Sequence, residues 1–328
     1  MVRRDEFDLI SGVFAPLARR HPAALNLADD AAVLPPPPDG QHTVVSVDTV
    51  VAGVHFLQAD PADLVARKAL RVNLSDMAAM GAEPVGVFLS MALSPAEDDA
   101  WLDRFIAGLD ADLGTYGIGL LGGDTVSTPG PACFTVTILG HVPPDAYLSR
   151  GGGTVGDDVW VSGTLGDGAL GLKLLTGALR MEEPDMAAFL ADRYRVPRPR
   201  VDLGLALRRV ASAALDISDG LVADLGHMCL ASGCGARVDA ARVPLSDAAR
   251  RCLGDDPTWR DLPLTGGDDY ELVFAAPPGR AASVQEIGVR LGLPLTRIGC
   301  LVAGQGVTLV SEDGTPRPLG TAGWRHHW

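Results

Sequence analysis

Apolar residues recur along the chain in two spacings, one typical of strands and one typical of helices. Short runs rich in β-branched residues predict strands at 43–47, 85–93, 134–142 and 158–162. Apolar residues at helical spacing, or a turn signal followed by a long apolar run, predict helices at 5–20, 60–81 and 95–113. A segment rich in proline and glycine at 143–153 interrupts this pattern and predicts a boundary between two domains, 1–146 and 147–328.

The stretch at 46–82 combines a strand, a loop and a helix, and it carries polar residues at the points where they meet. The β-branched run predicts a buried strand that stops at Asp48, and His55 lies in the loop that follows. Asn73 and Asp76 are three residues apart and share one face of the predicted helix. Because apolar residues flank Asp76 on both sides, we interpret this face as a site and not as a solvated helix surface.

Further carboxylates lie at the ends of apolar elements elsewhere in the chain. They are Asp29 and Asp30, Asp124 in a predicted Gly-Gly-Asp turn, Asp216 and Asp219 on either side of Ser218, and Asp268 in a second Gly-Gly-Asp turn. Taken alone, the pair at 29–30 fits a surface turn equally well. Taken together, carboxylates at element ends repel one another unless cations neutralise them, which favours several Mg²⁺ ions and a polyphosphate.

Two stretches match the glycine spacing of dinucleotide-binding loops. The stretch at 117–122 predicts a strand and leads into a turn, so we reject it. The stretch at 166–171 has the correct strand and helix flanks, but Asp167 within it would repel a pyrophosphate. We interpret this second loop as a tight turn that allows close helix packing.

Composition narrows the class of protein. Of the 328 residues, 47% are hydrophobic and 21% charged, which is typical of a globular protein, and no apolar run reaches transmembrane length. The formal charge of −14 argues against a nucleic-acid partner. Five cysteines without a C-x-x-C pair are typical of reduced thiols in the cytoplasm. No G-x-x-x-x-G-K-[ST] loop is present, so a bound nucleotide would depend on divalent cations.

Six segments together resemble a known family, and they occur in that family's order from one end of the chain to the other. They lie at 29–30, 46–56, 68–82, 122–125, 215–221 and 266–272. In these segments the chain is similar to the thiamine-monophosphate kinases of the PurM-like superfamily, which is named after aminoimidazole ribonucleotide synthetase. The resemblance implies transfer of the γ-phosphoryl group of ATP to thiamine monophosphate. It also implies an α+β fold of two domains, with the N-terminal strands of two subunits joined in one barrel of a homodimer.

The resemblance assigns roles to individual positions of this sequence. The family's Mg²⁺-binding positions match Asp30, Ser46, Val47, Asp48, Asp76, Asp124, Asp216 and Asp219, among which Asp48, Asp76, Asp124 and Asp219 are expected to carry catalysis. Its nucleotide contacts match Gly122, Gly123, Arg150 and Ser218, and its thiamine-side contacts match His55, Asp268 and Trp324. From sequence alone, Arg150 fits a solvated linker residue as well as a phosphate clamp, and Trp324 fits a surface residue almost as well as a lid.

Three positions depart from the family pattern. Ala28 replaces the usual glycine before the paired acids, Val47 stands where threonine is common, and Asp268 often corresponds to glutamate. At Val47 only the backbone carbonyl can serve as a ligand. Two other functions stay open at this point: an ATP-dependent enzyme of the same superfamily with another acceptor, such as a selenophosphate synthetase or a hydrogenase-maturation protein, and a divalent-cation-binding protein without catalysis.

Overall fold

The computed structural model describes residues 10–27, 31–38, 40–311, 315–317 and 323. The chain divides into two units, each built around a sheet of its own. Unit 1 comprises residues 1–77 and 82–145, and unit 2 comprises residues 78–81 and 146–328. Among the described residues, no helix is both long enough and apolar enough to cross a membrane.

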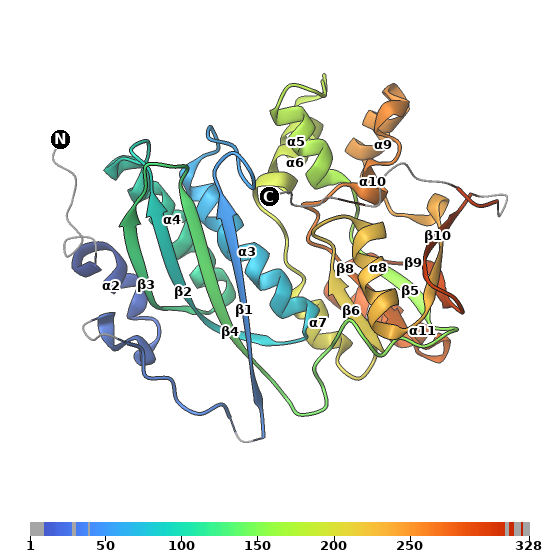
Figure 1. Cartoon of the computed structure of the whole chain (residues 1–328), viewed down its shortest axis with the longest axis horizontal. Coiled ribbons are helices and arrows are strands. Elements are labelled where there is room, and N and C mark those ends of the chain that lie inside the picture. The colour runs from blue at the N-terminus through green and yellow to red at the C-terminus, as the bar shows by residue number, and fades with distance from the viewer. Residues whose placement is uncertain (1–9, 28–30, 39, 312–314, 318–322, 324–328) are drawn as a thin grey trace. The chain divides into compact units, whose positions relative to one another are not determined.

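Unit 1 is a four-stranded sheet with helices on one face (Figure 1). Its strands are β1 (His42–Val51), β2 (Glu83–Leu93), β3 (Gly119–Ser127) and β4 (Cys133–Val142), in the order β1-β4-β2-β3. β4 is antiparallel to both neighbours, whereas β2 and β3 are parallel. The helices are α3 (Ala62–Ala79) and α4 (Asp99–Tyr116), with the shorter η1 (Ile10–Phe14), α2 (Ala15–Ala18) and η2 (Pro22–Leu27) before β1.

Helices α3 and α4 pack closely because a glycine leaves room for their backbones to approach and a buried ion pair links them. A Cβ atom on Gly108 of α4 would lie only 2.1 Å from the Asp63 carbonyl oxygen of α3. Nearby, the Arg71 Nε of α3 donates to the Asp112 carboxylate of α4 at 2.5 Å. The sequence prediction of these two helices is confirmed, with α4 shifted by a few residues toward the C-terminus. The structure describes the predicted helix at 5–20 only from Ile10 onward.

Two predictions in unit 1 are wrong. β1 does not stop at Asp48 but continues to Val51, and its Val45 and Val47 side chains are 59% and 58% exposed. β1 is an edge strand with one open face, so its β-branched residues alternate between the helices and solvent. The segment at 122–125 is not a turn, because it lies inside β3. Its Gly123 is needed for close packing, since a Cβ there would lie 2.0 Å from the Leu89 carbonyl oxygen.

Unit 2 is a six-stranded sheet with the order β10-β7-β9-β5-β8-β6. Its strands are β5 (Asp158–Ser162), β6 (Ala213–Asp216), β7 (Gly235–Asp239), β8 (Leu272–Ala276), β9 (Leu295–Val302) and β10 (Gly306–Val310). Its α-helices are α5 (Asp167–Leu175), α6 (Pro184–Arg195), α7 (Val201–Leu207), α8 (Leu221–Ser232), α9 (Asp247–Asp255), α10 (Leu262–Thr265) and α11 (Ala281–Leu291). Its 3-10 helices are η3 (Ala240–Arg242), η4 (Pro257–Trp259) and η5 (Pro278–Arg280).

Alternation along the strands of unit 2 creates two apolar layers. Val159 and Val161 of β5 pack with α8, whereas Trp160 between them packs with α7 and α11 on the other face. Such a strand, buried on both faces, reads in sequence as a continuous apolar run, and the predicted strand at 158–162 is confirmed. The ends of these buried strands then present the loops that carry the candidate residues of unit 2.

Candidate active site

Strand β1 and helix α3 bring Asp48 and Asp76 together in unit 1. The Ser46 hydroxyl donates to the Asp76 Oδ2 at 2.5 Å, and Asp48 and Asp76 share a side-chain hydrogen bond. The buried Asn73 accepts from the Asp48 N–H at 3.1 Å and donates to the Ala69 carbonyl at 2.9 Å. Asn73 and Asp76 therefore share one face of α3 and contact β1, which confirms the geometry predicted from their spacing.

The carboxyl group of Asp48 is costly to ionise in this place. Burial and the charge of Asp76 raise the pKa of Asp48 from its ordinary value of 3.8 to about 6. Near neutral pH the two carboxylates therefore repel each other unless a cation lies between them. Two carboxylates and the Ser46 hydroxyl form an all-oxygen donor set of the kind that Mg²⁺ prefers, so these residues fit the metal that the sequence predicts.

His55 lies in the turn that follows β1. Its Nδ1 atom accepts a hydrogen bond from the Val51 N–H at 3.1 Å, and Gly53 supplies a left-handed backbone at φ 79°. Because Nδ1 is an acceptor, a neutral His55 imidazole carries its proton on Nε2. His55 can therefore present a donor to a ligand with a ring orientation that the end of β1 already determines.

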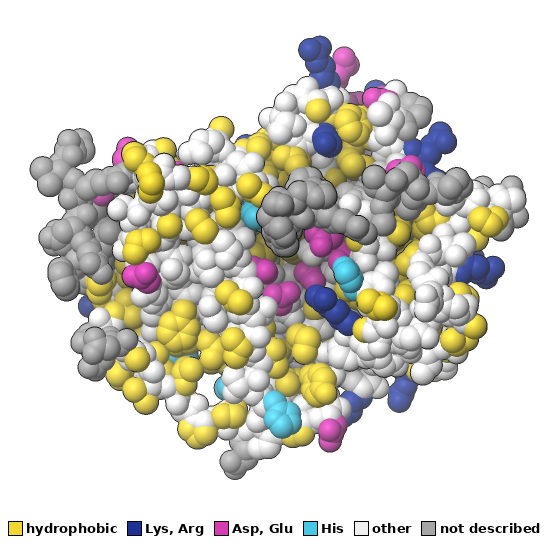
Figure 2. Space-filling model, in the orientation of Figure 1, with side chains coloured by type: hydrophobic (Ala, Val, Ile, Leu, Met, Phe, Trp, Pro, Cys, Tyr) yellow, Lys and Arg dark blue, Asp and Glu magenta, His cyan; other side chains and the backbone are white. Residues whose placement is uncertain are grey.

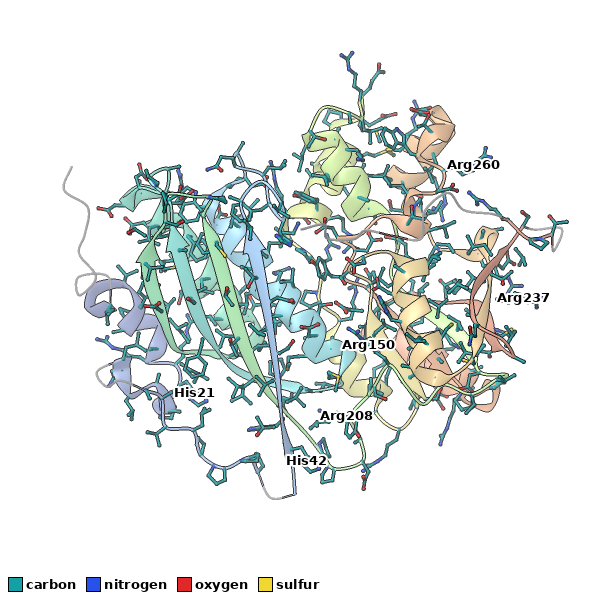
Figure 3. All side chains as sticks on the ribbon, in the orientation of Figure 1. His21, His42, Arg150, Arg208, Arg237 and Arg260 are labelled. Carbon is teal, nitrogen blue, oxygen red and sulfur yellow. The ribbon has the colours of Figure 1, made fainter. Side chains whose placement is uncertain are left out.

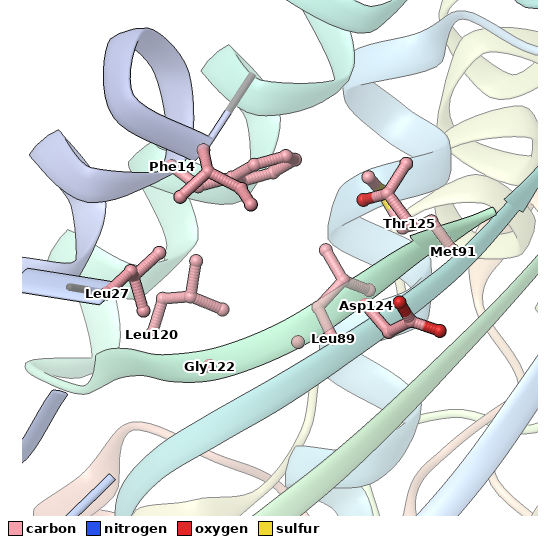
Figure 4. A pocket seen from close by; sticks show the side chains of 10 residues that line it. Phe14, Leu27, Leu89, Met91, Leu120, Gly122, Asp124 and Thr125 are labelled. Carbon is pink, nitrogen blue, oxygen red and sulfur yellow. The ribbon is translucent and has the colours of Figure 1, made fainter. Parts of the chain in front are cut away.

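Asp124 does not join Asp48 and Asp76 within one copy of the chain. β3, which carries Asp124, and β1 lie at opposite edges of the sheet, with β4 and β2 between them. Three strand spacings correspond to about 14 Å. Asp124 is exposed and lies instead at the opening of a cavity of about 70 Å³ that Gly122, Gly123 and the apolar side chain of Phe14 help to line (Figure 4).

In unit 2, Asp216 is the last residue of β6, and Ser218 and Asp219 lie in the loop between β6 and α8. The Asp224 carboxylate in the first turn of α8 accepts from the N–H groups of all three residues at 218–220, at 3.0 to 3.1 Å. Burial and the charge of Asp219 raise the pKa of Asp224 to about 7. Sequence reasoning missed Asp224, although an acid in the first turn of a helix after a glycine is a common signal for a carboxylate that binds loop N–H groups.

A second loop, at 266–271, is hydrogen-bonded to the first. The Asp268 N–H donates to the Ser218 carbonyl at 3.0 Å, and the Tyr270 N–H donates to the Ile217 carbonyl at 2.8 Å. The structure therefore brings Asp268 together with Ser218 on neighbouring loops of unit 2. Arg150 belongs to the same unit, where its exposed side chain lies in the segment before β5 (Figure 3). Its carbonyl accepts from the Ser232 hydroxyl of α8 at 3.3 Å.

The glycine loop before α5 binds an internal carboxylate. The Gly166 and Gly168 N–H groups donate to the Asp269 carboxylate at 2.6 and 3.1 Å. Asp269 thus occupies the position that a phosphate takes in dinucleotide-binding loops, which agrees with the interpretation of this stretch as a tight turn. Sequence reasoning missed both Asp269 and Arg193. Arg193 lies in α6 and is buried, 2% exposed, against Glu271.

Two predicted site residues, Asp30 and Trp324, lie outside the described residues. Within the described ranges, no group of three or more His, Cys, Asp or Glu side chains is arranged as a complete metal site. The candidate residues that the structure does describe form separate sets. Ser46, Asp48 and Asp76 lie at one edge of the unit 1 sheet and Asp124 at the other. In unit 2, Asp216 ends β6, while Ser218, Asp219 and Asp268 occupy two loops.

The fold and these loops match a known class of two-domain proteins. Residues 28–142 match the family model for the N-terminal domain of AIR synthase related proteins, and residues 154–312 match the model for their C-terminal domain. A thiamine-monophosphate kinase from Caulobacter vibrioides is 45% identical over 326 residues, covering 98% of this chain and 90% of the relative. The chain therefore belongs to the thiamine-monophosphate kinase family.

Solved structures agree with this assignment. A thiamine-monophosphate kinase from Stenotrophomonas maltophilia K279a matches with a TM-score of 0.83 and 42% identity, over 92% of this chain and 96% of that one. A second structure, described as AaThiL complexed with AMPPCP and TMP, matches with a TM-score of 0.78 and 30% identity, over 91% of each chain. The predicted α+β, PurM-like fold and the family resemblance are both confirmed.

We predict that Asp48→Asn stabilises the metal-free protein more at high pH than at low pH. The folded state binds the Asp48 proton more tightly than the unfolded state, with a pKa of about 6 against 3.8. This contribution to stability is fully present only below the unfolded pKa of 3.8 and is lost as the pH rises through about 6. The variant should therefore gain up to about 3 kcal/mol over wild type at pH 8 and only about 1 kcal/mol at pH 4.5. Urea unfolding in EDTA at both pH values measures the difference, and an equal difference at both would contradict the prediction.

Proposed function

We propose that this chain catalyses transfer of the γ-phosphoryl group of ATP to thiamine monophosphate, giving thiamine diphosphate and ADP. The observation that carries the proposal is 45% identity to a thiamine-monophosphate kinase across nearly the whole chain. The similar structure with AMPPCP, an ATP analogue, and TMP bound supports the same pair of substrates. The chemistry of the described residues is compatible with it, because carboxylates on rigid elements suit a metal-dependent phosphoryl transfer.

In this proposal several Mg²⁺ ions are held by oxygen ligands. The ligands are Asp30, Ser46, the Val47 carbonyl, Asp48, Asp76, Asp124, Asp216 and Asp219, of which Asp48, Asp76, Asp124 and Asp219 are the catalytic ones. When bound, the ions neutralise the phosphates and the charge that develops on the transferred group. The raised pKa of Asp48 supports this use of the site, because a cation next to Asp48 and Asp76 removes the repulsion between them.

The other residues bind and orient the two substrates. Gly122 and Gly123 allow the nucleotide to approach the backbone of β3, Ser218 contacts it through the loop that Asp224 holds, and Arg150 binds phosphate. His55, Asp268 and Trp324 contact the thiamine side. The Nε2–H of His55 is a donor of known orientation, because Nδ1 is engaged by Val51. The acceptor is already a phosphate anion, so alignment replaces a strong general base.

Other enzymes of this fold stay weaker candidates. Hydrogenase maturation proteins match with TM-scores of 0.73 to 0.79 but only 20 to 23% identity, which shows the shared fold alone. A cation-binding protein without turnover would use the same carboxylates, but it gives no reason for full-length identity to a kinase family. An assay with a panel of phosphate acceptors separates all three functions.

We predict ADP formation equal to thiamine diphosphate formation, and only when both Mg²⁺ and thiamine monophosphate are present. Asp76→Asn should lower kcat by about a hundredfold or more because it removes a metal ligand, while the variant stays folded. The matched control is Asp63→Asn, at a half-buried position in the first turn of the same helix. Coupled ADP release and a product assay measure both quantities. Equal turnover with free thiamine, or wild-type kcat in Asp76→Asn, would overturn the proposal.

We also propose a homodimer in which the open faces of two unit 1 sheets pack together. Hydrophobic side chains lie over β1, β4 and β2 on the face of this sheet without helices (Figure 2), together with threonines such as Thr49 and Thr135. Val45 and Val47 are more than half exposed there. Large exposed apolar patches on a globular protein favour association. A dimer would also allow an Asp124 of one copy to approach Asp48 of another, which the sheet order prevents within one copy.

The dimer proposal predicts that Val45→Lys dissociates the protein into single chains. A lysine at this position would bury a charge in the interface, which is unfavourable by several kcal/mol. Val289→Lys on α11 of unit 2 is the control, because Val289 is 83% exposed and lies on a helix. Light scattering should give twice the chain mass for wild type and the control, and the single mass for Val45→Lys. A Val45→Lys protein that keeps the double mass would contradict this interface.

We place the enzyme in the cytoplasm, without a membrane or nucleic-acid partner. The placement rests on the formal charge of −14 and on five free cysteines, of which Cys229, Cys234 and Cys252 are buried. Cell fractionation tests it, since recovery of the protein with membranes would contradict it.

A further inference from the structure

The loop at 266–271 stores backbone strain at Asp268 and Tyr270. Asp268 has φ 69° and Tyr270 has φ 51°, so two non-glycine residues lie in the left-handed region within three positions. Each such residue costs on the order of 1 to 3 kcal/mol and persists only where the surroundings impose it. Strain of this kind is concentrated at functional sites. The question is therefore which contacts impose it here.

Asp269, between the two strained residues, is anchored to another part of unit 2. Its side chain is 1% exposed, and its carboxylate accepts from the Gly166 and Gly168 N–H groups at the start of α5. On either side, the N–H groups of Asp268 and Tyr270 donate to carbonyls of the neighbouring loop. The main chain is thus held at both strained positions, while the carboxylate between them faces inward.

A buried ionic cluster continues this anchor. Glu271 is fully buried and accepts from Arg200 at 2.5 and 2.6 Å, from Arg193 at 3.0 Å and from the Ser162 hydroxyl at 2.6 Å. Arg193 also donates to the Asp269 carbonyl at 3.4 Å. Two arginines from α6 and the start of α7 therefore hold Glu271 while Asp269 binds α5, so the loop is attached to three separate helical segments.

The loop also has little room to shift. A Cβ atom on Gly168 would lie 2.2 Å from the Asp268 carbonyl oxygen, so the backbone of α5 is in direct contact with the strained residue. Buried ion pairs contribute little net stability compared with apolar residues of the same size. Because this cluster adds little stability and imposes strain at Asp268, we interpret its role as holding Asp268 in a fixed position.

We propose that Asp269 is a positioning residue for the phosphoryl acceptor, and that with Glu271, Arg193 and Arg200 it holds Asp268 in the strained conformation that contacts thiamine monophosphate. This inference rests on the proposed function, in which Asp268 contacts the thiamine side of that substrate. Asp269 itself faces away from the ligand, toward α5. Its removal releases the strain and lets the Asp268 carboxylate leave its place, so binding of the acceptor weakens while the nucleotide is unaffected.

Asp269→Asn tests the proposal, with Asp158→Asn as the matched control. Asp158 is also buried, 3% exposed, and pairs with Arg297 at 2.9 Å, but it lies at the start of β5, whereas Ser162 at the end of that strand contacts the cluster. We expect Asp269→Asn to raise KM for thiamine monophosphate about tenfold or more, with kcat and the KM for ATP little changed. Calorimetry with thiamine monophosphate alone should show the same loss of affinity. Asp158→Asn should change neither the KM nor the calorimetric affinity for thiamine monophosphate.

A double-mutant cycle distinguishes positioning from general destabilisation. If Asp269 acts through Asp268, then Asp269→Asn should add nothing to the KM of an Asp268→Ala variant. Arg200→Lys is a milder second variant that keeps the charge but loses the bidentate geometry, and it should raise the same KM by a smaller factor. If Asp269→Asn does not fold, the KM of Arg200→Lys for thiamine monophosphate tests the proposal instead.

Two results would overturn the inference. One is a KM for thiamine monophosphate in Asp269→Asn and Arg200→Lys that equals that of the control. The other is an increase in that KM on Asp269→Asn that is equal in the wild-type and Asp268→Ala backgrounds. Wild-type protein that fails to phosphorylate thiamine monophosphate would instead overturn the proposed function, so the two failures are distinguishable.

Discussion

Repulsion between neighbouring carboxylates is the constraint on which the rest of this structure depends. Each unit brings acids close together, and their charge is balanced in two different ways. Asp224, Asp269 and Glu271 are satisfied internally, by backbone N–H groups or by arginines. Asp48 and Asp76 lie close enough to raise the pKa of Asp48, and in the proposed function a cation balances their charge.

The two kinds of carboxylate have different roles in the proposed mechanism. The internally satisfied acids stiffen loops: Asp224 holds the turn at 218–220, and Asp269 holds the strained loop beside it. Asp48 and Asp76 lie instead on a strand and a helix of unit 1, where hydrogen bonds involving Ser46 and Asn73 join the two elements. Because phosphoryl transfer depends on alignment and charge neutralisation, a rigid frame around exchangeable cations is the form of catalysis that this chain can support.

Local geometry explains which parts of the site the sequence predicts. Asn73 and Asp76 lie on one face of α3 because three residues make nearly one helical turn, and this relation needs no knowledge of the rest of the fold. Long-range contacts explain what it misses. Arg193 contacts Glu271, which is 78 positions away in the chain, so its sequence neighbours give no sign of this contact. The sequence around Gly123 predicts a turn, but a glycine is required there because the Leu89 carbonyl of the adjacent strand leaves no room for a Cβ atom. Likewise, nothing local shows that β1 is an edge strand.

The most direct test is the effect of Mg²⁺ on thermal stability as a function of pH. If Asp48 and Asp76 bind a cation, Mg²⁺ must displace the Asp48 proton, so it should raise Tm more at pH 8 than at pH 5. In Asp48→Asn this pH dependence should disappear, because the group that loses the proton is gone. An equal increase in Tm at both pH values, or a pH dependence that the variant retains, would show that the repulsion between these two carboxylates is not what the cation relieves.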